Sequence, residues 1–313
     1  MVDACLARSP GEVRRRHRLW KSQLAIQMNT RHQIIIPCQP ANPVDYLACC
    51  GLADLLARLD RTTRTHWRTV APLAFVMEST LTEAEFLATL LATFRIASRW
   101  RFIPDDSEEP ARIKVEFTPE GRDAFTVALD WWYETLTDKG EIGEKSAWKM
   151  YAANQTVKGT TFTLLEAAAS LAEPNSIATL LTAGAPMTGR FGFDPRSSRD
   201  ALNAGYSAND LKLPVKTHPF AELLVTFGAA AFFPSRCGRA GDLSSSRGWR
   251  ERSEGRSGFA YYLWPSPLPA MLARLAAGIE SVPGALLLFA GRSYRGQFSN
   301  LEFAHQTAKH IKQ

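Results

Sequence analysis

The residues best suited to chemistry in this chain are arginines in a glycine- and serine-rich stretch, residues 235–257. This stretch holds six arginines against three acidic residues, a local charge of +3. Arginine makes planar, multidentate contacts to phosphate, glycine lets backbone amides approach a ligand, and tryptophan can stack on a base. An exposed loop with no ligand is the alternative. The predicted nucleic-acid contacts are Arg236, Arg239, Arg247, Trp249, Arg250 and Arg252.

A second stretch, residues 145–159, mixes lysines, aromatic residues and side-chain amides. Asparagine and glutamine can read base edges in a bidentate way, and lysine neutralises phosphate. The alternative is a helix with a buried aromatic face and solvated lysines. A smaller cluster at 291–297 adds Arg292 and Arg295 as backbone contacts. The candidates in the second stretch are Lys145, Lys149, Asn154, Gln155 and Lys158.

A shorter arginine pair lies in residues 189–196, where a turn could bring Arg190 and Arg196 together. Asp194 lies between them in the sequence and can pair with either guanidinium. Such a pair would make Asp194 an internal structural clamp, which is our preferred interpretation over a ligand contact.

Catalytic and metal sites find little support in the sequence. The six histidines and five cysteines show no metal-ligand spacing, and no glycine motif of a known catalytic site occurs. The odd number and irregular spacing of the cysteines argue against a disulfide framework and fit a reducing cytoplasm. Cys49 or Cys50 with His218 as base would be the nucleophilic alternative, but cysteines in an amphipathic helix are usually buried hydrophobes. We therefore expect no catalytic residue and no cofactor. A stand-alone cysteine-dependent hydrolase or transferase is the competing hypothesis.

The net charge of +6 is concentrated at the amino-terminal end. Residues 1–31 hold seven basic and two acidic residues, whereas the remainder holds 30 basic and 29 acidic residues. A polyanion site in this nearly neutral body must therefore come from local clustering. We expect residues 1–30 to be disordered or an upstream-start extension, with a nucleic-acid-binding arm as the alternative. No apolar run reaches the roughly 18–20 residues of a membrane helix, so no transmembrane segment is expected.

The clearest local structure is a strand at 33–37 followed by a helix over 43–60. Asn42 suits the N-cap and Pro43 the first helical position, where no amide hydrogen is needed. Gly51 falls inside the helix, where glycine costs about 1 kcal/mol relative to alanine. We therefore predict that another backbone approaches the helix closely at Gly51.

The remaining elements alternate without a regular strand–helix–strand rhythm, which predicts an α+β fold. We expect a mixed, mainly antiparallel sheet covered by helices, with a second helix-rich layer or subdomain. One sheet should combine 33–37, 112–117 and 124–131 under the 43–60 helix. An N-terminal α+β region would span 31–160 and a C-terminal one 161–313. Further predicted helices are 82–94, 161–183 with a break at Pro174, 219–227 and 267–278; further strands are 232–233, 259–264 and 284–290.

Three stretches, in this order, resemble one known family. They are NPVDYLACCGLADLLARLD at 42–60, RFGFDPR at 190–196 continuing through Asn203–Ser207, and HPFAELL at 218–224 followed by Gly228 and Phe232–Phe233. The order and spacing are similar to the small large-subunit family of type I-G (formerly I-U) CRISPR surveillance complexes. The resemblance covers about residues 33 to 300.

The resemblance implies a non-catalytic subunit of an RNA-guided complex in the cytoplasm. Its expected roles are recognition of the short motif flanking the target, DNA binding and recruitment of the helicase-nuclease. The implied partners are guide RNA, target DNA, other complex subunits and the helicase-nuclease, with no membrane. Large-subunit relatives also carry a basic-aromatic-glutamine stretch comparable to residues 145–159. Local basic-aromatic segments on a neutral body agree with these expectations.

Overall fold

The computed structural model describes residues 31–103, 112–132, 148, 150, 155–196, 215–233, 248–251, 257–279, 282–295 and 298–307. Helices pack against antiparallel sheets in these residues, so the predicted α+β class is confirmed. The helices are α2 (Pro43–Leu59), α3 (Glu83–Phe94), α4 (Val157–Ser170), α5 (Ile177–Thr182), α7 (Pro219–Phe232), α8 (Ala270–Gly278) and the short 3-10 helix η1 (Ala97–Arg99).

Local sequence signals account for where these helices begin. The Asn42 side chain accepts a hydrogen bond from the amide of Val44 at 3.1 Å, and Pro43 opens α2. Thr82 and Glu85 form a capping box at α3. The long helix expected over 161–183 is instead α4 and α5, separated around Pro174, as its ring requires. The predicted cap at Asn42 and the predicted break at Pro174 are confirmed.

The strands form four antiparallel groups. The first sheet has the order β1 (His32–Pro37), β3 (Ala74–Ser79), β2 (Arg64–Arg68) and β11 (Leu268–Pro269). The second joins β4 (Trp100–Ile103), β5 (Arg112–Phe117) and β6 (Phe125–Leu129). The third has the order β13 (Phe298–Leu301), β12 (Leu286–Arg295), β10 (Ser257–Leu263) and β9 (Trp249–Glu251), with β14 (His305–Gln306) on β12. A two-stranded pair links β7 (Ala185–Met187) to β8 (Val215–Thr217).

Two predictions about strands are wrong. Strand β1 does not join β5 and β6, which form a separate three-stranded sheet with β4. Strand β1 pairs instead with β3, and β3 with β2, two strands that were not predicted from the sequence. Residues 232–233 are not a strand either, since Phe232 ends α7 and Phe233 is its C-cap.

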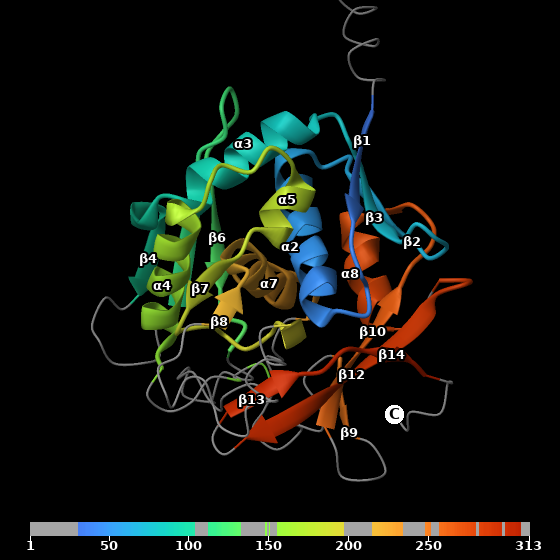
Figure 1. Cartoon of the computed structure of the whole chain (residues 1–313). Helices are drawn as coiled ribbons and strands as arrows, with labels where there is room; N and C mark the ends of the chain where they lie inside the picture. Colours follow the sequence, from blue (N-terminus) through green and yellow to red (C-terminus); the bar gives the residue numbers. More distant parts are fainter. Residues whose placement is uncertain are drawn as a thin grey trace, which may run out of the picture.

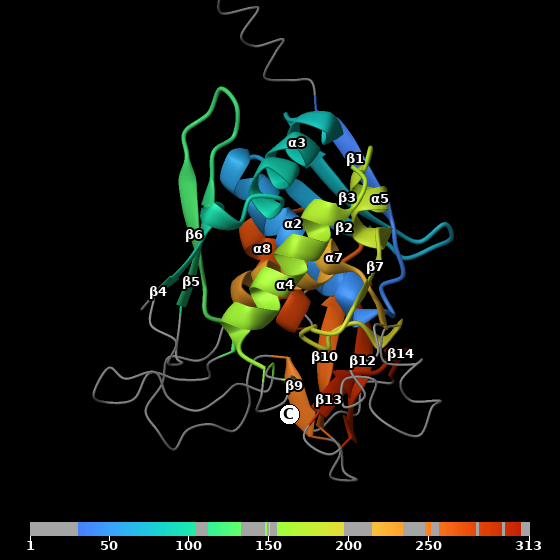
Figure 2. The ribbon, with the colours of Figure 1, turned by 60° about the vertical axis from the view of Figure 1, so that its left-hand side comes forward.

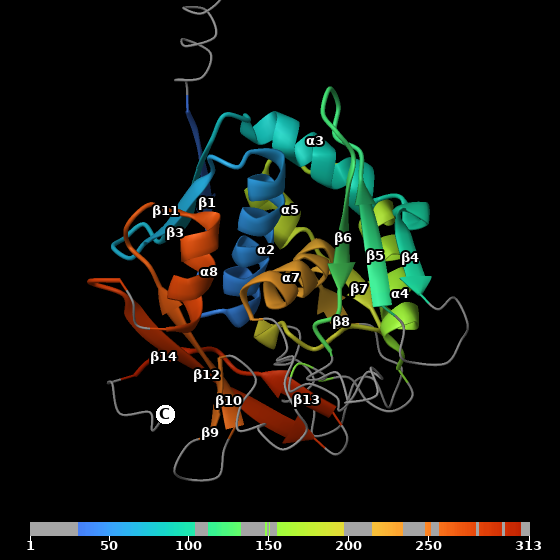
Figure 3. The ribbon, with the colours of Figure 1, turned by 180° about the vertical axis from the view of Figure 1, so that it is seen from behind.

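Helices α2 and α7 form the centre of the molecule, between the first and second sheets, with the third sheet at one end (Figures 1 and 3). Helix α4 contacts α7 and lies in front of it in the view of Figure 2. Leu52, Leu55 and Leu56 on α2 are buried, as the amphipathic pattern predicts. One hydrophobic core extends from Ile34 to Ala304, so the boundary expected near residue 160 does not divide it.

The two central helices touch through glycines. A Cβ atom added at Gly228 would lie 3.0 Å from the amide nitrogen of Gly51 and still closer to the carbonyl oxygen of Leu47. A Cβ atom added at Gly51 would meet the carbonyl oxygen of Leu224 in the same way. The predicted approach of another backbone at Gly51 is therefore confirmed, and its partner is α7.

Candidate functional site

The three sequence stretches that carry the family resemblance meet at one place, which we call the polar junction. It comprises the start of α2 (Asn42, Asp45), the 190–196 segment (Arg190, Asp194, Arg196) and the start of α7 (His218, Glu222). The junction gathers side chains that are far apart in the sequence and mostly buried. Its geometry decides whether it is a clamp or a reactive site.

Asp194 is the centre of the junction and is fully buried. One carboxylate oxygen accepts from Nε of Arg196 at 2.9 Å, and the other lies 2.8 Å from Nδ1 of His218. Arg196 also approaches the Asp45 carboxylate at 3.4 Å, which links the segment to α2. Burial alone would raise the pKa of Asp194, but the hydrogen bonds from His218 and Arg196 outweigh it and lower the pKa to about 2. The predicted pairing of Asp194 with an arginine is confirmed, and the partner is Arg196.

Glu222 fastens the same segment from α7. Its two carboxyl oxygens accept hydrogen bonds from the backbone amides of Phe191 at 3.2 Å and Asp194 at 3.1 Å. Glu222 is fully buried, and this burial raises its pKa to about 7, with the charge of Asp194 adding to the effect. Arg190 and the two amides act in the opposite direction. A signal for this role is present in the sequence, because Glu222 is an acidic residue in an otherwise apolar helical stretch, and such a residue needs a buried partner. The role of Glu222 was not predicted from this signal.

Arg190 completes the charge balance of the junction. Its side chain is buried, and burial lowers the pKa of the guanidinium while Glu222 and Asp194 raise it. The junction thus sets acidic groups against arginines and backbone donors, as a structural clamp requires.

The thiols proposed as alternative nucleophiles lie in unsuitable surroundings. Cys49 and Cys50 are fully buried in α2, and burial raises the pKa of both thiols well above the usual value. The Cys49 sulphur contacts that of Cys38 at 3.9 Å, whereas His218 is bound to Asp194. A protonated, buried thiol is a poor nucleophile. Within the described residues, no group of three His, Cys, Asp or Glu side chains could hold a metal ion.

Glu222→Gln tests the electrostatics of the junction. Below about pH 4.5 the carboxyl group is protonated in both folded and unfolded chains. Between that pH and about 7 the unfolded chain releases the proton and the folded chain keeps it, so stability falls as the pH rises. The expected loss is on the order of 3 kcal/mol.

The measurement is the free energy of unfolding in urea at pH 4.5, 5.5, 6.5 and 7.5 for both proteins. The difference between wild type and Glu222→Gln isolates this group, because every other titratable side chain is present in both proteins. The difference should shrink with rising pH and become constant above about pH 7. A difference that is the same at every pH would refute a raised pKa at Glu222.

The third sheet collects the predicted nucleic-acid segments, and we call β9, β10, β12 and β13 the basic sheet. Arg250 lies on β9, and Arg292 and Arg295 lie on β12, with β10 paired between these strands. The guanidinium carbon of Arg292 is 5.6 Å from the centre of the Trp249 ring, and its Nη2 donates to Ser299 at 2.8 Å. The 235–257 and 291–297 stretches, predicted separately, therefore meet in one sheet.

Part of the 145–159 stretch reaches the same sheet. The ring of Trp148 is 5.2 Å from that of Trp249, and the carbonyl of Met150 accepts from the amide of Ser299 at 3.1 Å. Gln155 and Lys158 lie elsewhere, at the start of α4, where Lys158 is 5.8 Å from the ring centre of Phe102. The structure thus brings together three segments, but not all of their predicted residues.

Base stacking by Trp249 is a wrong prediction. The side chain is only 4% exposed, and it packs against Trp148 and Phe259 in the aromatic core. The amide oxygen of Gln155 is also buried, without a hydrogen-bond partner, so reading a base would require this side chain to turn outward. The predicted contacts Arg236, Arg239, Arg247, Arg252, Lys145, Lys149 and Asn154 lie outside the described residues.

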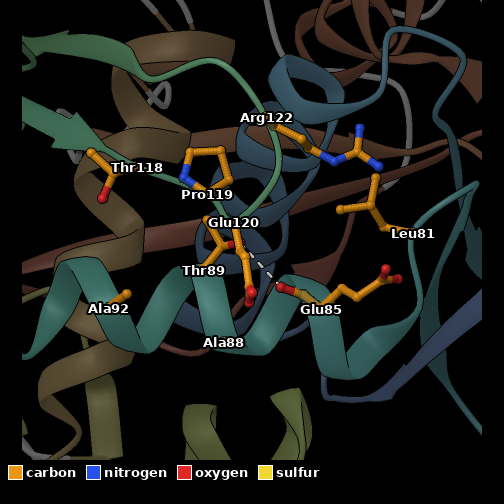
Figure 4. A pocket seen from close by; sticks show the side chains of 9 residues that line it. All are labelled: Leu81, Glu85, Ala88, Thr89, Ala92, Thr118, Pro119, Glu120 and Arg122. Atoms are coloured by element: carbon orange, nitrogen blue, oxygen red, sulfur yellow. Dashed lines mark hydrogen bonds between the residues drawn. The ribbon is translucent and has the colours of Figure 1, made fainter.

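A surface cleft of about 360 Å³ lies between α3 and the β5–β6 turn (Figure 4). Two of its charged groups already have partners: Glu85 accepts from Thr82, and Arg122 donates to the carbonyl of Leu59 at 3.0 Å. The cleft therefore contributes nothing to the functional argument. It is lined by Leu81, Glu85, Ala88, Thr89, Ala92, Thr118, Pro119, Glu120 and Arg122.

Comparison with protein-family models, curated proteins and solved structures found no match to this chain. Among the helices in the described part of the chain, none has the length and apolar character needed to cross a membrane.

Proposed function

We propose that this chain is the non-catalytic large subunit of a type I-G CRISPR surveillance complex in the cytoplasm. In this role it binds DNA, recognises the short motif flanking the target and recruits the helicase-nuclease. Its partners are guide RNA, target DNA, the other subunits of the complex and the helicase-nuclease. The observation that carries the proposal is the meeting of three predicted basic segments at the basic sheet.

The proposed role needs few protein side chains, because guide pairing supplies most of the sequence specificity. Arginines on a sheet edge and its connections are suited to phosphate positioning. The basic sheet is also fixed to the rest of the molecule. The hydroxyl of Tyr261 on β10 donates to the carbonyl of Pro40 at 2.7 Å, and the amide of Ala304 donates to the carbonyl of Ala41 at 2.7 Å. These bonds connect the sheet to the turn that enters α2, beside the polar junction.

The polar junction supports a framework role for the three resemblance segments. Its acids are engaged by Arg196, His218 and backbone amides, which together clamp two helices and a turn. The competing hypothesis, a cysteine-dependent hydrolase or transferase, requires Cys49 or Cys50 to ionise, and burial opposes this.

The proposal predicts that arginines next to β9 bind phosphate. Replacing Arg247, Arg250 and Arg252 together by alanine should weaken DNA binding by the assembled complex, because fewer counterions are released on binding. The salt dependence should flatten by about one unit of slope for each arginine that meets a phosphate. The measurement is the dissociation constant for target DNA from 50 to about 300 mM salt.

A matched control removes the same charge elsewhere. Arg61, Arg64 and Arg101 are exposed and lie outside the basic sheet, so their triple alanine variant should keep the wild-type slope. If both triple variants lose affinity for DNA equally, binding depends on the net charge of the chain and not on the position of these arginines. If the first variant binds as tightly as wild type at every salt concentration, these arginines do not contact DNA.

Replacement of Asn154 and Gln155 by alanine should act differently. Side-chain amides that read base edges change the preference among sequences, and they leave the number of neutralised phosphates unchanged. We expect altered preference among flanking motifs with a nearly constant salt slope, measured on a panel of duplexes that differ in that motif alone. Uniform weakening on all duplexes would contradict base reading.

A further inference from the structure

Cys38 and Cys49 form a close pair of thiols beside the start of α2. The Sγ atoms of Cys38 and Cys49 are 3.9 Å apart, and either thiol can donate to the other. Cys38 lies in the turn after β1 and is half-buried, whereas Cys49 lies in α2 and is fully buried. Cys38 is therefore the more exposed residue of the pair, and its sulphur contacts that of the buried Cys49.

We propose that Cys38 and Cys49 are an oxidation site, at which a hydroperoxide converts the thiol pair into a disulfide. A disulfide bond is about 2.05 Å long, so the sulphurs must approach by roughly 2 Å. Cys38 lies outside regular secondary structure, between β1 and α2, whereas Cys49 is held inside α2. We therefore assign the approach to the Cys38 side of the pair. Burial raises the pKa of Cys49 well above its usual value, which assigns the first reaction to Cys38.

The chemistry proceeds in two balanced steps. The Cys38 sulphur attacks one peroxide oxygen; the sulphur–oxygen bond forms, the oxygen–oxygen bond breaks, and water leaves with the thiol proton. The Cys49 sulphur, 3.9 Å away, then attacks the Cys38 sulphur and passes its proton to the departing hydroxyl. The disulfide forms, the sulphur–oxygen bond breaks and a second water leaves, so this step needs no free Cys49 thiolate. Two thiols lose two electrons, and the peroxide gains them.

The position of the bond gives it a structural consequence. The turn containing Cys38 also donates the Gln39 amide to Asp45 at 3.1 Å and accepts the Tyr261 hydroxyl at Pro40. A disulfide to Cys49 would close an 11-residue separation and fasten this turn to α2. Oxidation therefore acts at the point where α2, the polar junction and the basic sheet are joined.

Cys50 provides an internal control. It is adjacent to Cys49 in sequence and equally buried, but neighbouring residues of a helix point in directions about 100° apart. Cys50 should therefore stay reduced under conditions that oxidise its neighbour.

The test uses the full chain with Cys5 and Cys237 replaced by serine, since both lie outside the described residues. The reduced protein is treated with equimolar hydrogen peroxide without denaturant, then unfolded in guanidinium chloride containing N-ethylmaleimide so that every remaining thiol is blocked, digested and analysed by mass spectrometry. We expect a Cys38–Cys49 linked peptide that dithiothreitol reverses, with Cys50 carrying the maleimide. Cys50→Ala should form the same link, and in Cys49→Ser a dimedone adduct should appear on Cys38.

Oxidation of Cys38 to sulfinic or sulfonic acid without the link would overturn the proposal. A link through Cys50 would also overturn it. So would Cys38 and Cys49 that both stay reduced and carry the maleimide. These outcomes are measured with Cys38, Cys49 and Cys50 all in place, and the same digest of the wild-type chain shows whether the serines at positions 5 and 237 change the result.

Discussion

Replacing Gly228 by alanine should destabilise this protein by about 3 kcal/mol or more, because the new methyl group would collide with backbone rather than with movable side chains. The added Cβ would meet the carbonyl oxygen of Leu47 and lie 3.0 Å from the amide nitrogen of Gly51. Relief requires α2 and α7 to separate, and these helices form the centre of the core. The measurement is the free energy of unfolding in urea.

A matched control is available in another helix. Gly159 lies near the start of α4, and the close neighbour of an added Cβ there is the Thr156 hydroxyl at 3.1 Å. Gly159→Ala should change stability by less than about 1 kcal/mol, since helix propensity gains offset a small adjustment of the cap. Equal effects of the two substitutions would show that the helix crossing does not depend on Gly228.

Asp194→Asn should destabilise the protein by about 3 kcal/mol, because the remaining groups of the polar junction lose a buried countercharge. Asp194 accepts from both Arg196 and His218, and its backbone amide is held by Glu222. The asparagine side chain has nearly the same shape, so the effect reports charge and hydrogen bonding rather than packing. Urea unfolding at pH 7 gives the measurement.

The matched control is Asp123→Asn, which makes the same chemical change at an exposed position in the β5–β6 connection. Surface substitutions of this kind usually alter stability by less than about 0.5 kcal/mol. If Asp194→Asn is as mild as Asp123→Asn, the junction is not a clamp. A ligand-binding or reactive role for its charged groups would then become the better interpretation.

Local signals in the sequence were sufficient for much of the helical structure. Asn42 with Pro43, and Thr82 with Glu85, mark helix starts through contacts between neighbours in the chain. Gly51 predicted the close approach of another backbone, because glycine is costly inside a helix. The identity of the partner, α7, could not be predicted, since it depends on packing across more than 150 residues.

Strand pairing and burial were harder to predict, because both depend on distant parts of the chain. The two-residue strand β11 pairs with β2 from the other end of the sequence, and nothing local to Arg64–Arg68 indicates that partner. Trp249 was assigned to base stacking from its basic neighbours, whereas the fold buries it against Trp148. The polar junction was only partly predicted: its Asp194–Arg196 pair is local, but His218 and Glu222 arrive from α7.

The most direct test of the proposed function is affinity isolation of the tagged chain from the cells that encode it, followed by RNA sequencing and protein mass spectrometry. A large subunit should be recovered with repeat-derived guide RNA and with backbone subunits of the complex in constant proportion. Recovery without nucleic acid, together with an enzymatic activity that is lost on Cys50→Ala, would contradict the proposal and favour the cysteine-dependent enzyme.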